Sequence, residues 1–246
     1  MLSWEEFEKE CIKNNIYSIN NKSKKNIVLF GNCTIAPIGF FLNQLMNKHY
    51  NIHFIVSWLF EQKGFETFNM QQVNNSIQEV LRSADILVYH HHHKDYGIKA
   101  SKIIHFCNKN TLQLIMPNLH FCFDAPTSEL FQNSLSKLKT NIVERSDFKE
   151  FVFISEYYKT IRFFNTSVHP THYVLFLLAK SIKYKLIKET KLINIHSYHN
   201  EQNKIQFKNI KEFVCLPGFE RYTKEIHHIT GIIENADYFD YYFEFI

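Results

Sequence analysis

The sequence predicts one α/β domain built as a three-layer sandwich, with a mainly parallel central sheet between two layers of helices. Short, nearly continuous apolar runs predict the strands, because strands of a parallel sheet are buried on both faces. Each run is followed by a stretch in which apolar residues recur at helical spacing. The chain has 246 residues, of which 45% are hydrophobic and 21% charged, so it can form a large packed core.

The predicted elements alternate along the chain. The first strand ends at Gly31, and helical spacing begins near Ala36, with Pro37 tolerated in a first turn. A further helix near the N-terminus is predicted because Ser3 and Glu6 have capping-box spacing. The other elements are predicted from the same periodicities. The predicted strands are 26–30, 52–58, 84–89 and 111–116, and later helices are predicted around 77–81, 100–106, 127–138, 148–158 and 170–182.

The composition changes after residue 182, where short mixed segments rich in His, Lys and aromatic residues begin. We therefore predict a core domain over residues 1–182 and a C-terminal extension over residues 183–246 that packs on it. The aromatic cluster at 237–246 is interpreted as part of that packing. The alternatives are a subunit interface or a peripheral contact with a membrane surface.

Charge and cysteine content exclude several classes of protein. The net charge of +4 is mild and the densest basic run is short, so no nucleic-acid partner is predicted. The five cysteines show no CxxC spacing, which argues against a disulfide framework or a structural zinc site. The N-terminus does not resemble a signal peptide, and the longest apolar stretch, 173–179, is too short to cross a bilayer. We expect a cytoplasmic protein without a transmembrane segment.

Cys33 is the leading candidate for chemistry because it lies on the predicted turn between the first strand and the following helix. Open α/β proteins bind ligands at this edge of the sheet. Amides at a helix N-terminus can lower the pKa of a thiol and stabilise an oxyanion, to which Asn32 could donate a further hydrogen bond. Alternatively, Cys33 is a small buried apolar residue, as free cysteines often are.

His169 is the candidate partner of Cys33. It precedes a predicted helix that Pro170 would open, so its ring could face the same edge of the sheet. An imidazole there could deprotonate the thiol or a substrate hydroxyl. Alternatively, His169 is a capping or core residue, since the chain contains 14 histidines.

Two further histidine sites follow predicted strands. His90 begins a run of four histidines over residues 90–93, and His120 follows the fourth strand. Imidazoles can bind metal ions, but consecutive side chains point in different directions, so no metal site is predicted. A loop that contacts a ligand, with His90 nearest the strand, is the favoured interpretation. For His120 a loop residue packed among aromatic side chains is an equal alternative.

The segment from Gly31 to Gly39 resembles the first block of the SGNH/GDSL hydrolases, with Asn32 in place of Asp and Cys33 in place of the nucleophilic Ser. Residues 166–170 resemble the late Asp-x-x-His-Pro block, with Thr166 at the acid position. The Gly-Asn-Cys variant more closely resembles the WcbI-type polysaccharide-biosynthesis family. That resemblance covers roughly residues 26–182 and includes 89–90, 115–121, Pro126 and 163–170.

The resemblance implies an SGNH-like fold and a CoA-dependent O-acyltransferase. Such an enzyme would transfer an acyl group, most simply acetyl from acetyl-CoA, to a sugar hydroxyl of a capsular or other surface polysaccharide. Either Cys33 forms a thioester or His169 activates the sugar directly, and the residue that orients His169 is open. The residues implied to shape the acyl and coenzyme A site are Gly31, Asn32, Thr34, His90 and His120. The alternatives are a GDSL-like esterase that deacetylates a glycan and a non-catalytic protein that binds a glycan or nucleotide.

Overall fold

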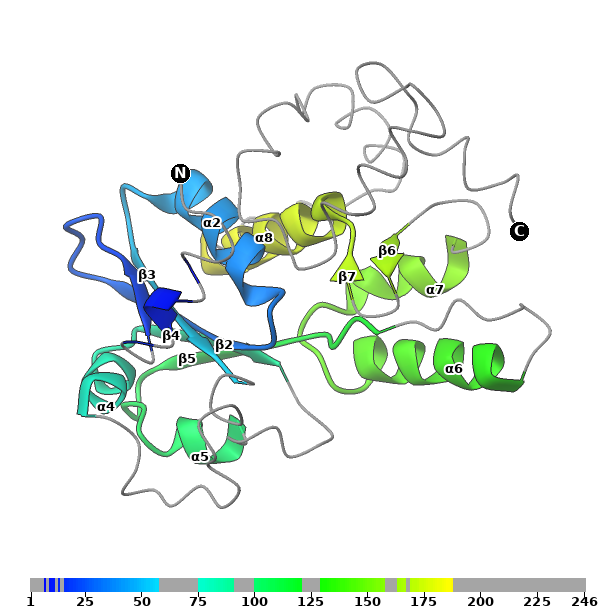
Figure 1. The fold of residues 1–246 in the computed structure, drawn as a ribbon, viewed down its shortest axis with the longest axis horizontal. Coiled ribbons are helices and arrows are strands. Elements are labelled where there is room, and N and C mark those ends of the chain that lie inside the picture. The colour runs from blue at the N-terminus through cyan, green and yellow to red at the C-terminus, as the bar shows by residue number, and fades with distance from the viewer. Residues whose placement is uncertain are drawn as a thin grey trace.

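The computed structural model describes residue 7, residues 9–11, residue 13 and residues 16–57, 75–90, 100–120, 129–157, 163–166 and 169–187. Within these residues, five strands form one twisted sheet with helices on both faces (Figure 1). The strands of this sheet are β1 (Tyr17–Ile19), β2 (Asn26–Gly31), β3 (Asn51–Val56), β4 (Ile86–His90) and β5 (Leu112–Met116), and β6 (Phe164–Thr166) pairs with β7 (His169–Pro170). The helices are α2 (Ile35–Met46), α4 (Asn75–Arg82), α5 (Ala100–Ile104), α6 (Glu129–Val143), the 3-10 helix η2 (Lys149–Val152), α7 (Phe153–Tyr157) and α8 (His172–Ile187).

The strand order of the main sheet is β1-β3-β2-β4-β5. The four strands β3, β2, β4 and β5 are parallel, and β1 is antiparallel to β3 at the edge. From β2 the chain passes to β3 on one side, whereas from β4 it passes to β5 on the other. The connections from the adjacent strands β2 and β4 therefore leave in opposite directions. Open α/β sheets bind ligands at such a switch point, beyond the carboxyl ends of the strands.

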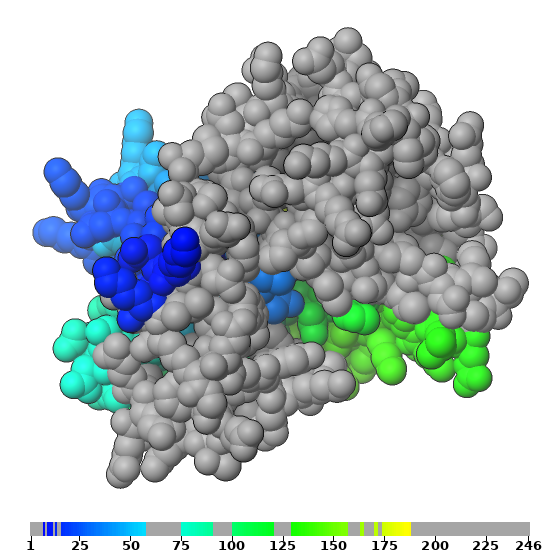
Figure 2. All heavy atoms as spheres, in the orientation of Figure 1, coloured from blue at the N-terminus to red at the C-terminus, as the bar shows by residue number. Residues whose placement is uncertain are grey.

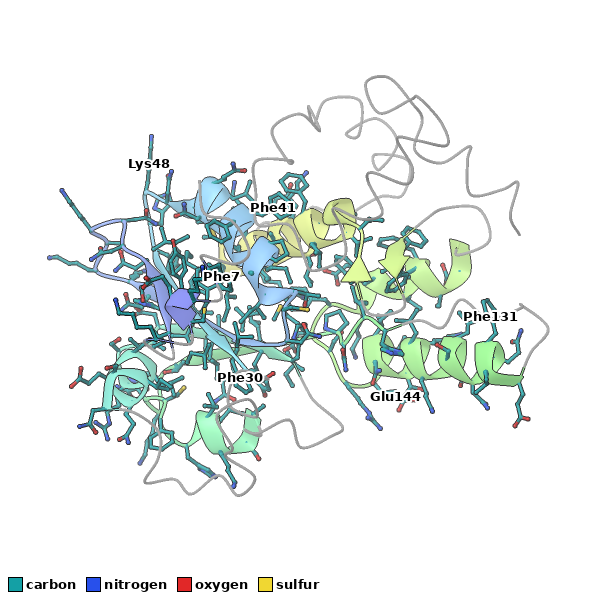
Figure 3. The ribbon with its side chains drawn as sticks, viewed as in Figure 1. Phe7, Phe30, Phe41, Lys48, Phe131 and Glu144 are labelled. Carbon is teal, nitrogen blue, oxygen red and sulfur yellow. The ribbon has the colours of Figure 1, made fainter. Side chains whose placement is uncertain are left out.

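The core lies in two layers because side chains alternate between the faces of each strand. Ile27 and Leu29 belong to the layer beneath α2 and α8, whereas Val28 and Phe30 belong to the layer over α4 and α5. Figure 3 shows the same division, with Phe30 on one side of the sheet and Phe7 and Phe41 on the other. Two-sided burial explains why the strands are almost continuously apolar in sequence.

Helix α2 lies unusually close to the sheet at Gly39. A Cβ atom at this position would lie 2.5 Å from Cζ of Phe54, closer still to Cε1 of the same ring, and 2.6 Å from Cδ1 of Leu29. The backbone conformation of Gly39 is one that other residues adopt readily. Glycine is therefore required here because a larger side chain has no room, and not because the backbone conformation excludes other residues.

The predicted alternation of strands and helices is confirmed, and the differences have local causes. We predicted that Pro170 opens the last helix, but His169 and Pro170 form β7. Helix α8 begins at His172 because Oγ1 of Thr171 accepts the backbone N–H of Val174 at 3.4 Å and caps the helix. Helix α6 continues past Leu138, since Ile142 extends its buried stripe.

Several sequence predictions concern residues that lie outside the described part of the chain. These are Ser3, Glu6, Trp58, residues 91–93 of the histidine run, Pro126 and all of 188–246. Helix α8 crosses the predicted domain boundary after residue 182 and extends to Ile187. Because residues 188–246 are not described, the C-terminal extension stays a prediction. Among the described residues, no helix combines the length and apolar character needed to cross a membrane.

Asp147 hydrogen-bonds to the outer side of β5, which is an edge strand of the sheet. The backbone N–H of Ile115 donates to Oδ2 of Asp147 at 2.6 Å, and the backbone N–H of Asp147 donates to the carbonyl of Ile115 at 2.9 Å. The two bonds imitate one rung of a β-ladder. They also fix the turn after α6 to the carboxyl half of β5.

Candidate active site at the carboxyl edge of the sheet

The turn from β2 to α2 is organised by the side chain of Asn32. Its Oδ1 atom accepts hydrogen bonds from the backbone N–H of Thr34 at 3.0 Å and from Oγ1 of Thr34 at 2.6 Å. The backbone N–H of Ile35 donates to the carbonyl of Asn32 at 3.2 Å. Because the amide oxygen faces these donors, Nδ2 is the end of the Asn32 side chain that can donate elsewhere.

Cys33 lies half-buried in this turn and packs against the core layer beneath α2. Burial raises the pKa of the Cys33 thiol to about 11, although the backbone N–H groups of Cys33 and Thr34 act in the opposite direction. The sequence suggested that helix amides lower the pKa of this thiol. The amides do have that effect, but desolvation outweighs it, so the thiol is protonated at neutral pH.

Alkylation of Cys33 is therefore expected to be slow at neutral pH and to rise about tenfold per pH unit toward pH 10, because only the thiolate reacts. The rate can be measured by iodoacetamide labelling followed by peptide mass spectrometry. Cys107 is a matched internal control, since burial also raises its pKa to about 11. A labelling midpoint at Cys33 of about 8.5 or lower would contradict the structure.

His90 forms one wall of the turn. It is the last residue of β4 and is buried, with its ring against the backbone of Gly31. A Cβ atom at Gly31 would lie 2.9 Å from Cγ2 of Ile35, 3.1 Å from Cε1 of His90 and closer still to Nδ1 of that ring. Among the described residues, no group hydrogen-bonds to this buried Nδ1 atom, although His90 does interact with other residues. The imidazole thus lies against Gly31, which precedes Cys33 by two residues.

The structure describes some of the remaining predicted residues in full and others only by their backbone. Thr34 is buried and donates to Asn32. His120 is exposed on the segment that follows β5, and its pKa is lowered by partial desolvation and by the nearby cation of Lys137. The backbone of His169 pairs with Thr166 just before α8, and α8 packs on α2. The side chains of His169 and Thr166 lie outside the described structure, so their roles stay predictions.

Two features of the described structure were missed from the sequence. Ser57 is buried, and its backbone N–H donates to the carbonyl of Gly31 at 2.8 Å, which joins the ends of β2 and β3. Its signal was a small polar residue inside the apolar run of the predicted strand 52–58. A shallow hollow on α6 is lined in part by Lys137, Asn141 and Arg145. The spacing of these three residues by four was its signal, because residues four apart share a helix face.

The overall fold resembles that of a solved structure. The fold is similar to that of WcbI. WcbI is described as a polysaccharide biosynthesis enzyme, in a structure of the native protein without a disulfide bond between coenzyme A and a cysteine. The TM-score is 0.51 at 12% sequence identity, and the match covers 67% of this chain and 70% of WcbI.

The other comparisons found no relatives. No family model matches the sequence, and no curated protein matches it. The likeness to WcbI is therefore a likeness of fold.

Proposed function

We propose that this protein transfers an acyl group, most simply acetyl, from acyl-CoA to a sugar hydroxyl during surface polysaccharide biosynthesis. The observation that carries the proposal is the position of Cys33 on a capped strand-to-helix turn at the switch point, in a fold similar to that of a polysaccharide biosynthesis enzyme whose description names coenzyme A. The SGNH-like character of the fold and the O-acyltransferase class belong to this proposal.

In the covalent route, Sγ of Cys33 attacks the carbonyl carbon of the acyl thioester. The new S–C bond forms as the bond to the sulfur of CoA breaks, and the thiol proton passes through His169 to the departing CoA thiolate. The sugar hydroxyl then attacks the acyl-Cys33 thioester and gives its proton to His169, which returns it to the sulfur of Cys33. The raised thiol pKa makes this route depend on a base, because little thiolate is present beforehand.

In the direct route, His169 takes the proton of the sugar hydroxyl, whose oxygen attacks the acyl carbonyl carbon of the bound thioester. The CoA thiolate leaves and receives that proton. Nδ2 of Asn32 and the amides of the turn stabilise the oxyanion in both routes. In this proposal His90 shapes the floor of the site and His120 contacts coenzyme A. The raised pKa of Cys33 is compatible with this route without deprotonation of the thiol.

The proposal is tested by calorimetric titration of the purified protein with CoA and acetyl-CoA. We expect the wild type to bind both with Kd values of about 10 μM. Cys33→Ala is expected to retain this affinity within about threefold and, in the covalent route, to lose transfer by about a hundredfold or more. Cys107→Ala is the matched control, because Cys107 is also a half-buried free cysteine.

Intact-mass measurement after mixing with acetyl-CoA separates the two routes. A bound acetyl group in the wild type and in Cys107→Ala, absent from Cys33→Ala, would establish the covalent route. Full transfer activity in Cys33→Ala would establish the direct one. Failure of a folded wild-type protein to bind either ligand would overturn the CoA-dependent proposal in favour of the esterase or the non-catalytic binder.

A further inference from the structure

Two adjoining turns at the amino end of the sheet carry a group of lysines. The turn between β1 and β2 contains Lys22, Lys24 and Lys25, and the turn between α2 and β3 contains Lys48. All four residues are exposed, and we call them the lysine cluster. The two turns lie at the left-hand edge of the molecule in Figure 2, and Figure 3 shows the side chain of Lys48 pointing away from the body of the protein.

Hydrogen bonds of the buried side chain of Asn51 hold the two turns together. Its Oδ1 atom accepts the backbone N–H groups of Asn21 at 2.9 Å and Ser23 at 3.1 Å, and its Nδ2 atom donates to the carbonyl of Ser23 at 2.8 Å. Oγ of Ser23 donates to the carbonyl of His49 at 2.6 Å, which joins one turn to the other. The lysines are therefore carried by a preorganised backbone, which lowers the entropy cost of binding a partner.

The lysine cluster is positively charged and largely without neighbouring acids. Within the described part of the chain, none of its four ammonium groups forms an ion pair. The sequences of the two turns, residues 20–25 and 47–50, contain no Asp or Glu. Asp85 borders the cluster, where its Oδ2 atom accepts the backbone N–H of Asn26 at 2.8 Å. One bordering carboxylate leaves most of the positive charge of four lysines unbalanced.

Local structure accounts for only part of this cluster. Lys48 lies two residues beyond α2, where the partial negative charge of a helix C-terminus favours a cation. Nζ of Lys25 lies 6.0 Å from the ring centroid of Tyr50, at the limit of a cation–π contact. Lys22 has a φ of 58°, which is a conformation that favours glycine or asparagine. The fold thus gives no reason for lysine at position 22, and we look for the reason in a partner.

The composition of the cluster fits an extended anionic surface better than a single bound anion. Its four members are all lysines, whose ammonium groups act as point charges, whereas a discrete phosphate or carboxylate is recognised best by the planar fork of an arginine. Clusters of four or more basic residues are attracted to membranes that contain anionic lipids. Tyr50 lies beside Lys25, and tyrosine is a residue that membrane interfaces favour.

We propose that the lysine cluster docks the protein on a membrane surface that contains anionic phospholipids. The ammonium groups bind the phosphates of the lipid headgroups, and the contact is peripheral. Strands β2 and β3 begin beside the cluster and end at the candidate active site, so the docked protein holds the Cys33 turn away from the lipid. The inference rests on the charge and order of the two turns, and it does not depend on the proposed function.

The test is co-sedimentation of the purified protein with vesicles of phosphatidylcholine alone and with vesicles that also contain about 30% phosphatidylglycerol. We expect binding to the anionic vesicles at about 0.1 M salt, little binding to the neutral ones, and release at about 0.5 M salt. The variant in which Lys22, Lys24, Lys25 and Lys48 are all replaced by Gln should bind the anionic vesicles about tenfold more weakly or worse. The turns should survive this change, because their hydrogen bonds use the backbone N–H groups of Lys22 and Lys25 and not their side chains.

Two further variants separate the cluster from the net charge of the protein. Replacement of four exposed lysines elsewhere by Gln removes the same charge and should leave vesicle binding within about threefold of the wild type. The residues for this matched control are Lys109, Lys137, Lys139 and Lys149. Replacement of the four cluster lysines by Arg keeps the charge and should preserve binding within about twofold.

Each other outcome would overturn the inference. Equal weakening by the two Gln variants would mean that only the net charge of the protein matters. Equal binding to neutral and anionic vesicles would place the membrane contact elsewhere on the chain. Failure of the folded wild type to bind anionic vesicles would remove the membrane as the partner, even if it bound a soluble acidic polysaccharide such as polygalacturonate. None of these results bears on the binding of CoA, so the proposed function is tested separately.

Discussion

Replacement of Gly39 by alanine is expected to destabilise the protein by about 3 kcal/mol, although alanine is the better helix former by about 1 kcal/mol. The new methyl group would lie inside van der Waals distance of Phe54 and Leu29, both of which are fully buried. The ring of Phe54 cannot easily move aside, because its centroid lies 5.6 Å from those of Phe7, Tyr17 and Phe40. Helix α2 would have to lift from the sheet.

The free energy of unfolding can be measured by urea denaturation followed by far-ultraviolet circular dichroism. The double variant Gly39→Ala/Phe54→Leu tests the cause, since a smaller side chain at 54 should accommodate the methyl group. Its loss of stability is expected to be less than the sum of the two single losses by about 1 kcal/mol or more. Unchanged or greater stability in Gly39→Ala would mean that helix propensity outweighs the close approach, contrary to this account.

Replacement of Gly31 by alanine is expected to affect both stability and the site. The added Cβ would overlap the imidazole of His90 and approach the side chain of Ile35. Overpacking of this kind destabilises a core by about 2 kcal/mol. Because Gly31 is followed directly by Asn32 and Cys33, we also expect CoA affinity to fall by about tenfold as the turn shifts.

The combined variant Gly31→Ala/His90→Ala separates steric overlap from other effects. Removal of the ring makes room for the methyl group, so the penalty for Gly31→Ala should shrink in the His90→Ala background. Urea denaturation and CoA titration give the two readouts. An equal penalty in both backgrounds would place the strain elsewhere than at the His90 ring.

The sequence was most informative where burial is two-sided. Runs such as 26–30 and 86–89 predict strands because no surface position interrupts them. It was least informative for β1, β6 and β7, which have only two or three residues each and depend on pairing with distant segments. The start of α8 was misplaced because Pro170 suits both a strand and a first helical turn, whereas Thr171 is the residue that caps.

The sequence predicted where in the fold the candidate site lies, but not which side chains contact one another there. The position of Cys33 on a strand-to-helix turn followed from periodicity alone. The contact between Gly31 and His90 did not, since it requires that β2 and β4, distant in sequence, be neighbours in the sheet. Likewise, the sequence indicated that Gly31 ends a strand, but not why this residue is glycine. The reason is that the His90 ring leaves no room for a Cβ atom there. The net effect of burial on the Cys33 thiol also depended on packing that no local pattern encodes.

The hydrogen bonds between Asp147 and Ile115 affect how readily the protein associates with itself at high concentration. At the other end of the same strand, Leu112 is 47% exposed and Gln113 is exposed as well. A parallel sheet that ends in an apolar strand can template the addition of a strand from another molecule, which is how aggregation and domain swapping begin. In the described part of the chain, one carboxylate occupies the N–H that an incoming strand would need at Ile115, and its charge disfavours the approach of apolar segments. Asp147 thus disfavours self-association through the outer edge of β5.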